Sequence, residues 1–241
     1  MLNFFKKNKA KSNPISIDIH SHLIPGVDDG VKSMEEALGI IKSFESMGYS
    51  KIITTPHIMK EYYDNDKSTL HPGFEELQAR IISENIDIKL EYAAEYQMDE
   101  FFIEKVDKDE ELLTFGDGYV LVETSFYNAP VFLKDVFFTL KTKGYSPIYA
   151  HPERYLYLMQ NFQLARDLKN MQVLFQINAV SLTGHYGKPV KKLAEKLIEE
   201  EMVDFIGSDC HNAGHMEILQ KAIQTNSYQN LPFDRLLNNS L

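Results

Sequence analysis

Cysteine occurs only once in this chain, at Cys210, so the sequence offers no disulfide framework and no cysteine-based zinc finger. Positive charge is scarce as well, because 25 lysines and arginines stand against 35 aspartates and glutamates and leave a formal net charge of −10. A surface that binds nucleic acid phosphates needs a basic stripe, and we therefore expect no nucleic-acid partner. The lack of disulfide pairs is consistent with a reducing compartment, and we expect a cytoplasmic location.

Long hydrophobic runs are also missing, and no segment approaches the roughly 20 apolar residues that cross a bilayer. The first residues, MLNFFKKNKAKSNP, combine apolar side chains with lysines. An export signal places its charge before an apolar run of at least about seven residues, whereas here the short run from Leu2 to Phe5 comes first. We predict a flexible basic tail over residues 1–14 that makes at most a weak contact with an anionic membrane or an acidic partner.

The body of the chain alternates between short β-rich runs and helical patterns. The predicted strands cover residues 15–20, 51–56, 86–96, 119–124, 146–151, 173–178 and 203–208. Each run is rich in Ile, Val, Tyr or Phe and is bounded by turn residues. Between the strands, Ser33 with Glu36 predicts the start of a helix and Gly48 predicts its end, and Pro189 predicts the start of a later helix.

Seven strand and helix units predict an α/β fold with a parallel sheet, and closure into a barrel would cover both faces of that sheet. A chain of 241 residues can bury a full core as one unit, and we expect a single domain over residues 15–241. The C-terminal ends of the strands in such a barrel share one rim. Residues that are far apart in the sequence are therefore expected to meet there.

Histidines and carboxylates recur at the ends of the predicted strands. They are His20, His22, Asp29, His57, Glu95, Glu123, His151, Asp209 and His211. Imidazole together with carboxylate is the ligand set of zinc, manganese and iron, whereas calcium and magnesium favour oxygen ligands alone. The pattern therefore predicts a metal centre that holds more than one ion.

Each of these positions, taken alone, also has an ordinary structural explanation. A single His or Glu at a strand end is commonly hydrogen-bonded or solvated, and Asp29 in VDDG would also fit a turn. Recurrence at almost every strand end favours metal binding, and the two histidines of DIHSH would point the same way on an extended strand. Arg154 in HPER fits either phosphate binding or a salt bridge at the rim.

The motifs DIHSHLIPGVDDG, TTPH, AHPERY, INAVSLTGHYGKPVKKLAEKLI and SDCHN resemble, in kind and order, those of the PHP (polymerase and histidinol phosphatase) superfamily. Within it, the chain most resembles the manganese-dependent bacterial tyrosine-protein phosphatases of the CpsB/CapC type, which are encoded with capsule and exopolysaccharide genes. The resemblance implies a distorted (β/α)7 TIM-like barrel, the PHP fold, with three divalent metal ions at its rim. Manganese is the ion expected, although such donors also accept iron, cobalt or zinc.

The resemblance further implies how the ions are held. His20, His22 and Asp209 would hold one ion, Glu123 and His151 a second, and Asp29, His57 and His211 a third, with Glu95 bridging between ions. Four carboxylates against three divalent ions leave a net positive pocket that suits a phosphate dianion. Water activated at the ions would attack phosphorus, with His151 and Asp209 at the catalytic centre and Arg154 binding the phosphoryl oxygens.

The function implied is hydrolysis of phosphotyrosine in a protein. The expected partner is the tyrosine-rich tail of a cognate bacterial tyrosine kinase that regulates capsule or exopolysaccharide synthesis. Two alternatives stay open, namely a PHP phosphatase for a small metabolite such as histidinol phosphate and a PHP binding module without catalysis. The sequence also leaves the oligomeric state open.

Two departures around the SDCHN motif bear on this function. Related phosphatases usually carry a second arginine shortly after the motif, whereas this chain has His215, which would donate to phosphate if protonated. A cysteine-dependent phosphatase needs an arginine six residues after its cysteine, and Met216 stands there instead. We therefore expect Cys210 to be a small buried residue and not a nucleophile.

Overall fold

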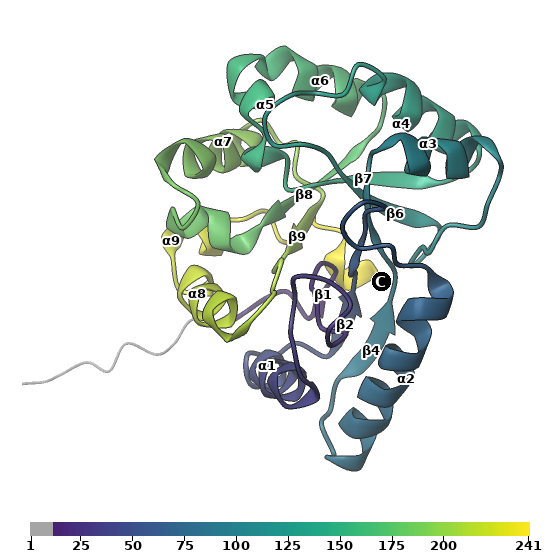
Figure 1. Ribbon diagram of the computed structural model, residues 1–241. Coiled ribbons are helices and arrows are strands. Elements are labelled where there is room, and N and C mark those ends of the chain that lie inside the picture. The colour runs from purple at the N-terminus through teal and green to yellow at the C-terminus, as the bar shows by residue number, and fades with distance from the viewer. Residues whose placement is uncertain (1–11) are drawn as a thin grey trace, which may run out of the picture.

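The computed structural model describes residues 12–241, in which parallel strands lie in the middle and helices surround them (Figure 1). One sheet contains, in order, β1 (Ile17–Asp18), β2 (Lys51–Thr54) and β4 (Lys89–Tyr92). The other contains β3 (His57–Ile58), β5 (Glu95–Gln97), β6 (Tyr119–Glu123), β7 (Ser146–Ala150), β8 (Leu174–Asn178) and β9 (Phe205–Gly207). The predicted α/β fold with parallel pairing is confirmed.

One predicted strand is divided in the structure, and another is followed by a separate short strand that the sequence did not predict. Residues 51–56 contain β2, and the short strand β3 follows just beyond them, whereas residues 86–96 correspond to β4 followed by β5. The register continues across the interruption, since Thr54 pairs with Tyr92 and His57 pairs with Glu95, three residues further along both strands. Pro56 has no amide hydrogen for the ladder and lies at this interruption. Glu95 therefore begins β5, whereas the sequence predicted that it would end a strand.

The first and last strands approach each other without forming a regular ladder. Beyond their ends, Ser21 and Cys210 form an isolated parallel bridge. Within the gap, the Asp18 carboxylate accepts hydrogen bonds from the amide (2.8 Å) and the hydroxyl (2.9 Å) of Ser208. Side chains thus join β1 to β9 where backbone pairing is interrupted, and the two sheets take a barrel-like arrangement.

Helices cover the outside of the strands. The longer ones are α1 (Met34–Ser46), α2 (Lys67–Ser83), α3 (Glu100–Asp107), α4 (Leu133–Thr142), α6 (Phe162–Asn170), α7 (Lys188–Glu199) and α8 (Ala213–Ile223). Shorter turns are η1 (Pro152–Arg154), α5 (Leu156–Gln160), η2 (Ala179–Thr183), α9 (Asn226–Gln229) and η3 (Asn238–Ser240). The Ser33 hydroxyl caps α1 by accepting from the Glu36 amide, Gly48 follows the helix with a φ of +89°, and Pro189 is the second residue of α7.

Alternate residues of the strands pack on opposite sides. In β6, Val120 and Val122 contact the large core shared with the helices, whereas Leu121 belongs to a smaller cluster with Ile148 and Phe205. This alternation is the two-residue period of a strand. The smaller cluster fills the space between strands and leaves the rim to polar side chains.

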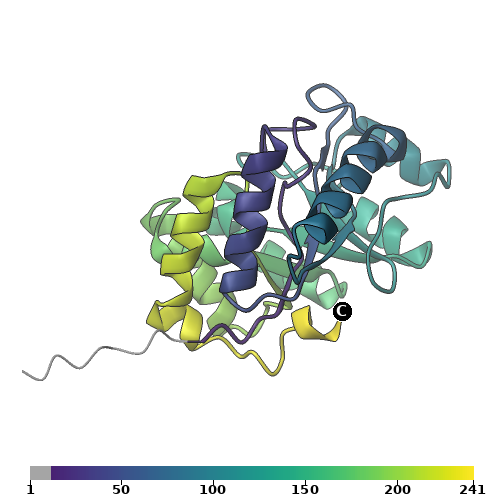
Figure 2. The same ribbon diagram turned by 90° about the horizontal axis from the view of Figure 1, so that it is seen from below.

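The C-terminal segment lies at the opposite end of the molecule from the loop that precedes α1 (Figure 2). There the buried side chain of Asn238 donates to the carbonyl oxygens of Ile17 (3.0 Å) and Ile206 (2.7 Å) and accepts from the Ile206 amide (3.0 Å). We call this end of the barrel the base. Asn238 ties the last turn of the chain to both β1 and β9.

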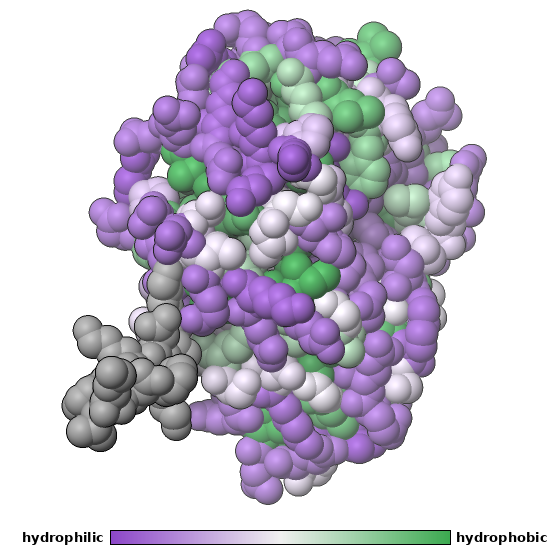
Figure 3. Space-filling model, turned by 90° about the vertical axis from the view of Figure 1, so that its left-hand side faces the viewer, coloured by the Kyte–Doolittle hydropathy of each residue, from purple (hydrophilic) through white to green (hydrophobic). Residues whose placement is uncertain are grey.

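The outer surface is mostly polar on the side that carries α7, α8 and α9, where apolar residues show only in separate areas (Figure 3). Of the predicted basic tail, residues 1–11 lie outside the described part of the chain. Residues 12–14 lie against the body, since Asn13 accepts from the Tyr228 hydroxyl (2.7 Å) and the Pro14 carbonyl accepts from Asn239 (2.8 Å). Among residues 12–241, none of the helices combines the length and the apolar character needed to cross a membrane.

Candidate metal centre

All nine predicted ligands lie together at the rim. Their donor atoms form four groups, each within 4.8 Å, namely His22 with Asp29, His57 and His211; His20 with His22 and Glu95; His20 with His151 and Asp209; and His57 with Glu95 and Glu123. Members shared between groups link them into one continuous cluster. Residues from almost every strand therefore converge as the sequence predicted, because parallel strands end on the same side.

Glu95 lies in the middle of this cluster. Its Oε2 atom is 3.1 Å from His20 Nε2, 3.2 Å from His57 Nδ1 and 3.4 Å from His22 Nε2. Its other oxygen accepts from His151 Nε2 at 3.0 Å. A carboxylate that faces donors on several sides has the placement expected of a bridging ligand.

The other ligands form sets that overlap with one another, and the sets that the resemblance implied are among the close contacts. Asp29, His57 and His211 do form one group, which His22 joins. His151 groups with His20 and Asp209, and Glu123 groups with Glu95 and His57. Asp209 Oδ1 also lies 3.5 Å from His20 Nε2 and 3.6 Å from His22 Nε2, and His151 Nε2 lies 3.7 Å from Glu123 Oε2. Because the donors are closely spaced and shared between sets, the division among ions that the resemblance implied stays a prediction.

Six buried donor atoms of the cluster form no well-aligned hydrogen bond with any described residue, although some of them lie only 3.1 Å apart. They are His20 Nε2, His22 Nε2, His57 Nδ1, His151 Nδ1, Glu95 Oε2 and Glu123 Oε1. Leaving one buried polar atom without a partner costs about 1–3 kcal/mol, so six in one place are best explained by a ligand that satisfies them together. Imidazole nitrogens and carboxylate oxygens that face one another are the donors that divalent transition metals bind. The residues present therefore fit a metal centre.

The electrostatic field at the cluster favours cations. Burial alone would lower the pKa of His20, but the facing carboxylates of Glu95 and Asp209 outweigh burial and raise this pKa to about 10. Burial is likewise outweighed at His57, whose pKa Glu95 and Glu123 raise to about 10. Although burial acts to raise it, the pKa of Glu95 is held well below its ordinary value by the surrounding histidines.

Two residues that the sequence analysis did not assign orient the histidines. Asp28 Oδ2 lies 2.7 Å from His22 Nδ1, and Gln176 Oε1 lies 2.7 Å from His20 Nδ1. Each contact leaves the opposite ring nitrogen, Nε2, directed at the cluster, which is how outer partners commonly fix metal-binding histidines. Asp28 was detectable as the neighbour of Asp29, whereas Gln176 lies within a strand and carries no comparable signal.

The loop that holds Asp28 and Asp29 depends on Gly30. Asp28 accepts from the amides of Gly30 (2.9 Å) and His57 (3.0 Å), so its carboxylate ties the loop to the next strand. A side chain at Gly30 would place its Cβ 2.3 Å from the carbonyl oxygen of His22. Only glycine allows this close approach, which explains the residue that follows the two aspartates.

Two predicted ligands have left-handed backbone conformations. His151 has a φ of +34° and Asp209 has a φ of +51°, values that non-glycine residues seldom adopt. The Asp209 amide donates to the His20 carbonyl at 2.8 Å, and the Arg154 amide donates to the His151 carbonyl at 2.9 Å. Such strained residues concentrate at functional sites, where surrounding structure holds them.

Arg154 lies beside the cluster and contacts one of its members. Its Nη1 atom donates to Asp209 Oδ2 at 3.0 Å, and Asn178 donates to the same oxygen at 2.7 Å. The guanidinium carbon lies 4.4 Å from the ring centre of Phe126 and 4.4 Å from that of Tyr186. The ion pair with Asp209 and a role in phosphate binding are compatible, since the guanidinium has donors beyond the one that it uses here.

A cavity of about 610 Å³ opens over the cluster, and Arg154, Tyr186 and His215 are among its lining residues. Burial and the neighbouring His211 lower the pKa of His215, so hydrogen bonding to phosphate there would use the neutral imidazole. Cys210 is buried, as predicted, and burial raises the pKa of its thiol. A high thiol pKa opposes the thiolate that cysteine-dependent catalysis requires.

The chain matches a family of known proteins. The family model described as capsular polysaccharide synthesis, CpsB/CapC, matches residues 16–226. A putative tyrosine-protein phosphatase CapC from Staphylococcus aureus is 33% identical over 208 residues, which cover 86% of this chain and 81% of the relative. Tyrosine-protein phosphatase YwqE from Bacillus subtilis is 31% identical over 200 residues, which cover 81% of this chain and 77% of the relative.

Solved structures agree with this relationship. Crystal structures of YwqE from Bacillus subtilis and CpsB from Streptococcus pneumoniae, described as unique metal-dependent tyrosine phosphatases, match with a TM-score of 0.78 and 29% identity and cover 92% of this chain and 94% of that one. A histidinol phosphate phosphatase from Lactococcus lactis matches with a TM-score of 0.52 at 14% identity and covers 86% of this chain and 92% of that one, which supports the fold alone.

Proposed function

The chain belongs to the CpsB/CapC family of capsular polysaccharide synthesis proteins, and we propose that it is a metal-dependent phosphatase that hydrolyses phosphotyrosine in a protein. The observation that carries this proposal is the buried cluster of nine donors with unsatisfied atoms, placed beside an arginine at the floor of an open cavity. A non-catalytic binding module would have no need to keep that complete set.

The ligand set is suited to three divalent ions, for which we propose manganese. Such ions, when bound, lower the pKa of an attacking water and neutralise charge on the phosphoryl group and on the leaving oxygen. The histidines and carboxylates of the cluster would hold them, and Asp28 and Gln176 keep His22 and His20 in the required orientation. Phenolate is a good leaving group compared with an alkoxide, so no protein acid is required at the tyrosine oxygen.

Arg154 binds the phosphoryl oxygens in this mechanism. Its planar guanidinium can donate two parallel hydrogen bonds to phosphate, and the rings of Phe126 and Tyr186 restrict its orientation from both sides. Asp209 directs Oδ2 to Arg154 and Oδ1 toward His20 at 3.5 Å. One carboxylate thereby sets the arginine relative to the metal ligands, and the neutral ring of His215 supplies a further donor at the same cavity.

The physiological substrate that we propose is the tyrosine-rich tail of a cognate bacterial tyrosine kinase, through which the enzyme regulates capsule or exopolysaccharide synthesis. Support comes from the family description and from the names of the relatives. The cytoplasmic location expected from the single cysteine belongs to the same proposal.

The decisive test compares a phosphotyrosine peptide with histidinol phosphate, an alkyl phosphate, using protein that is stripped of metal and refilled with manganese. We expect manganese to restore phosphotyrosine hydrolysis and His151→Ala and Arg154→Ala to abolish it. His71→Ala and Arg80→Ala, at partly exposed positions of α2, are the matched controls and should keep activity. If only histidinol phosphate is hydrolysed, the metal centre is supported but phosphotyrosine is not the substrate. If neither compound is hydrolysed, the proposed phosphatase activity is wrong.

A further inference from the structure

Two further cavities lie next to the cavity over the metal centre, and each shares lining residues with the one before it. The cavity over the metal centre shares Met59, Tyr62 and Gln97 with a cavity of about 440 Å³. That cavity in turn shares Asp99 and Phe101 with a third, of about 510 Å³, which reaches the start of α2. We call the second and third cavities together the side groove. A phosphotyrosine side chain alone would occupy the cavity over the metals, so the side groove is available to further parts of a substrate.

Aromatic side chains are exposed along this path. Tyr62, in the loop after β3, is 75% exposed, and Phe101, in the first turn of α3, is 47% exposed. On another side of the metal cavity, Tyr127 is 72% exposed. Aromatic residues are enriched where proteins bind other polypeptides, because they offer large contact areas at little cost in side-chain entropy. Their position beside the metal centre points to contacts with a polypeptide chain.

The charged residues around the second cavity are all acidic. They are Glu61, Asp99 and Glu100. Asp99 caps α3 by accepting from the Phe102 amide at 2.8 Å. Glu61 and Glu100 are exposed and form no ion pair with any residue in the range 12–241.

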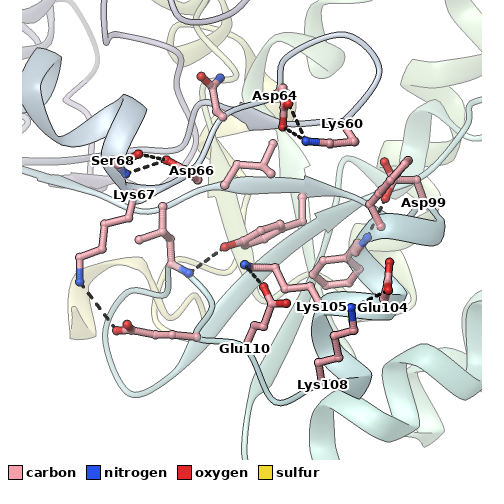
Figure 4. A pocket seen from close by; sticks show the side chains of 17 residues that line it. Lys60, Asp64, Asp66, Lys67, Ser68, Asp99, Glu104, Lys105, Lys108 and Glu110 are labelled. Carbon is pink, nitrogen blue, oxygen red and sulfur yellow. Dashed lines mark hydrogen bonds and ion pairs between the residues drawn. The ribbon is translucent and has the colours of Figure 1, made fainter.

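The lysines of the third cavity do not offset this charge, because they are paired. Figure 4 shows Lys60 beside Asp64, Lys105 beside Glu110 and Lys108 beside Glu104. A fourth, Lys67, lies 3.9 Å from Glu111. The side groove therefore presents unpaired negative charge next to the metal centre.

We propose that the side groove binds the polypeptide that flanks the phosphotyrosine, and that Glu61 and Glu100 select lysine or arginine in that segment. Tyr62 and Phe101 contact its apolar parts. This inference rests on the proposed phosphatase function and specifies its substrate class as phosphotyrosine in an extended, locally basic segment. Such a segment would also reduce the repulsion between a phosphorylated chain and an enzyme of formal net charge −10.

The test uses the manganese-loaded protein and two phosphotyrosine peptides of equal length, one with lysines and one with glutamates on both sides of the phosphotyrosine. In low salt, we expect the lysine peptide to have a kcat/KM roughly three to ten times higher, the range that one or two exposed ion pairs produce. The double substitution Glu61→Gln with Glu100→Gln should bring the ratio to within about twofold, and high salt should do the same to the unaltered protein.

The matched control is Glu199→Gln, which removes an exposed carboxylate from α7, on a different side of the barrel from α2 and α3 (Figure 1). This variant should keep the full preference for the lysine peptide. A second variant, Phe101→Ala, should raise KM for both peptides more than it changes kcat. A small aryl phosphate, which fits the metal cavity alone, reports whether each protein retains an intact metal centre.

Equal kcat/KM values for the two peptides, or a preference that survives the double substitution, would overturn the inference. In both cases continued hydrolysis of phosphotyrosine would leave the proposed function standing. If the unaltered protein hydrolyses neither the peptides nor the aryl phosphate, the phosphatase function itself falls and the inference falls with it.

Discussion

The rim and the base of the barrel both bury polar side chains, but they satisfy them differently. At the base, Asn238 is fully buried and uses its side chain in three hydrogen bonds to the backbone of Ile17 and Ile206. At the rim, His20 and Glu95 are equally buried, yet His20 Nε2 and Glu95 Oε2, which lie 3.1 Å apart, form no well-aligned hydrogen bond with any described residue. The side chains are equally buried at both ends, and the difference lies in whether their polar atoms form hydrogen bonds within the protein.

The difference separates a structural polar group from a binding one. A buried amide with all of its bonds inside the protein stabilises the fold and needs nothing further. Buried imidazoles and carboxylates whose free atoms face one another are stable only with a bound cation or proton. Substitutions at the two ends should therefore affect different measurements.

The largest effect is expected for Glu95→Gln at the rim. An amide keeps the shape but removes the charge that Glu95 places among His20, His22 and His57. We expect kcat/KM to fall by more than about 100-fold, since even partners outside the metal ligands commonly contribute about 10- to 100-fold. Initial rates on a phosphotyrosine peptide test this, with the partly exposed Glu91→Gln as control. A loss below tenfold would contradict a central, bridging role.

A smaller effect is expected for Asp28→Asn, because Asp28 contacts the predicted ligands only from outside, through the ring of His22 and the amide of His57. The substitution weakens the 2.7 Å contact with His22 Nδ1 and should lower metal affinity by about 10- to 100-fold. Titration of the metal-free protein with manganese measures this affinity directly. Asp64→Asn, at an exposed position, should bind manganese as the unaltered protein does. Unchanged affinity in Asp28→Asn would show that the loop alone orients the histidine.

We expect Arg154→Lys to lower kcat/KM by about tenfold. Lysine keeps the charge but loses the planar group that lies between Phe126 and Tyr186 and donates to Asp209. Catalysis should fall mainly through a weaker hold on phosphate, while manganese affinity stays the same. Inhibition by inorganic phosphate should weaken in parallel with kcat/KM. If the variant keeps full activity, Arg154 does not bind phosphate and serves only as the ion-pair partner of Asp209.

The smallest effect on activity is expected at the base, for Asn238→Ala. Loss of the amide leaves backbone groups of Ile17 and Ile206 without partners and should lower the free energy of unfolding by about 1–3 kcal/mol. The kcat of the folded protein should not change, because the base does not touch the metal centre. Urea unfolding and initial rates on the same sample test the two statements. A fall in kcat without a fall in stability would contradict the separation of rim and base.

Local patterns were sufficient to identify much of this site. The two-residue period of HxH, the positions of the strands and the clustering of His and carboxylate at their ends all lie within short windows of sequence. The N-cap Ser33 and the left-handed Gly48 are likewise local features that the structure reproduces. The burial of Cys210 was also predicted correctly. The division of the strand predicted over residues 86–96 and the separate strand β3 were not predicted, since the pairing of a strand depends on its neighbour.

The identity of the nine donors and their common rim follows from the chain alone, because strand direction and side-chain period are set by residues near one another in sequence. The grouping of those donors, the contacts of Asp28 and Gln176 with the histidines, and the placement of Arg154 between two aromatic rings arise only on folding. These contacts join residues far apart in the chain, such as His20 and Gln176, which are 156 positions apart, and they depend on distances of a few tenths of an ångström. Sequence patterns can indicate single residues of this kind, but only the packing of the folded chain determines which of them are in contact.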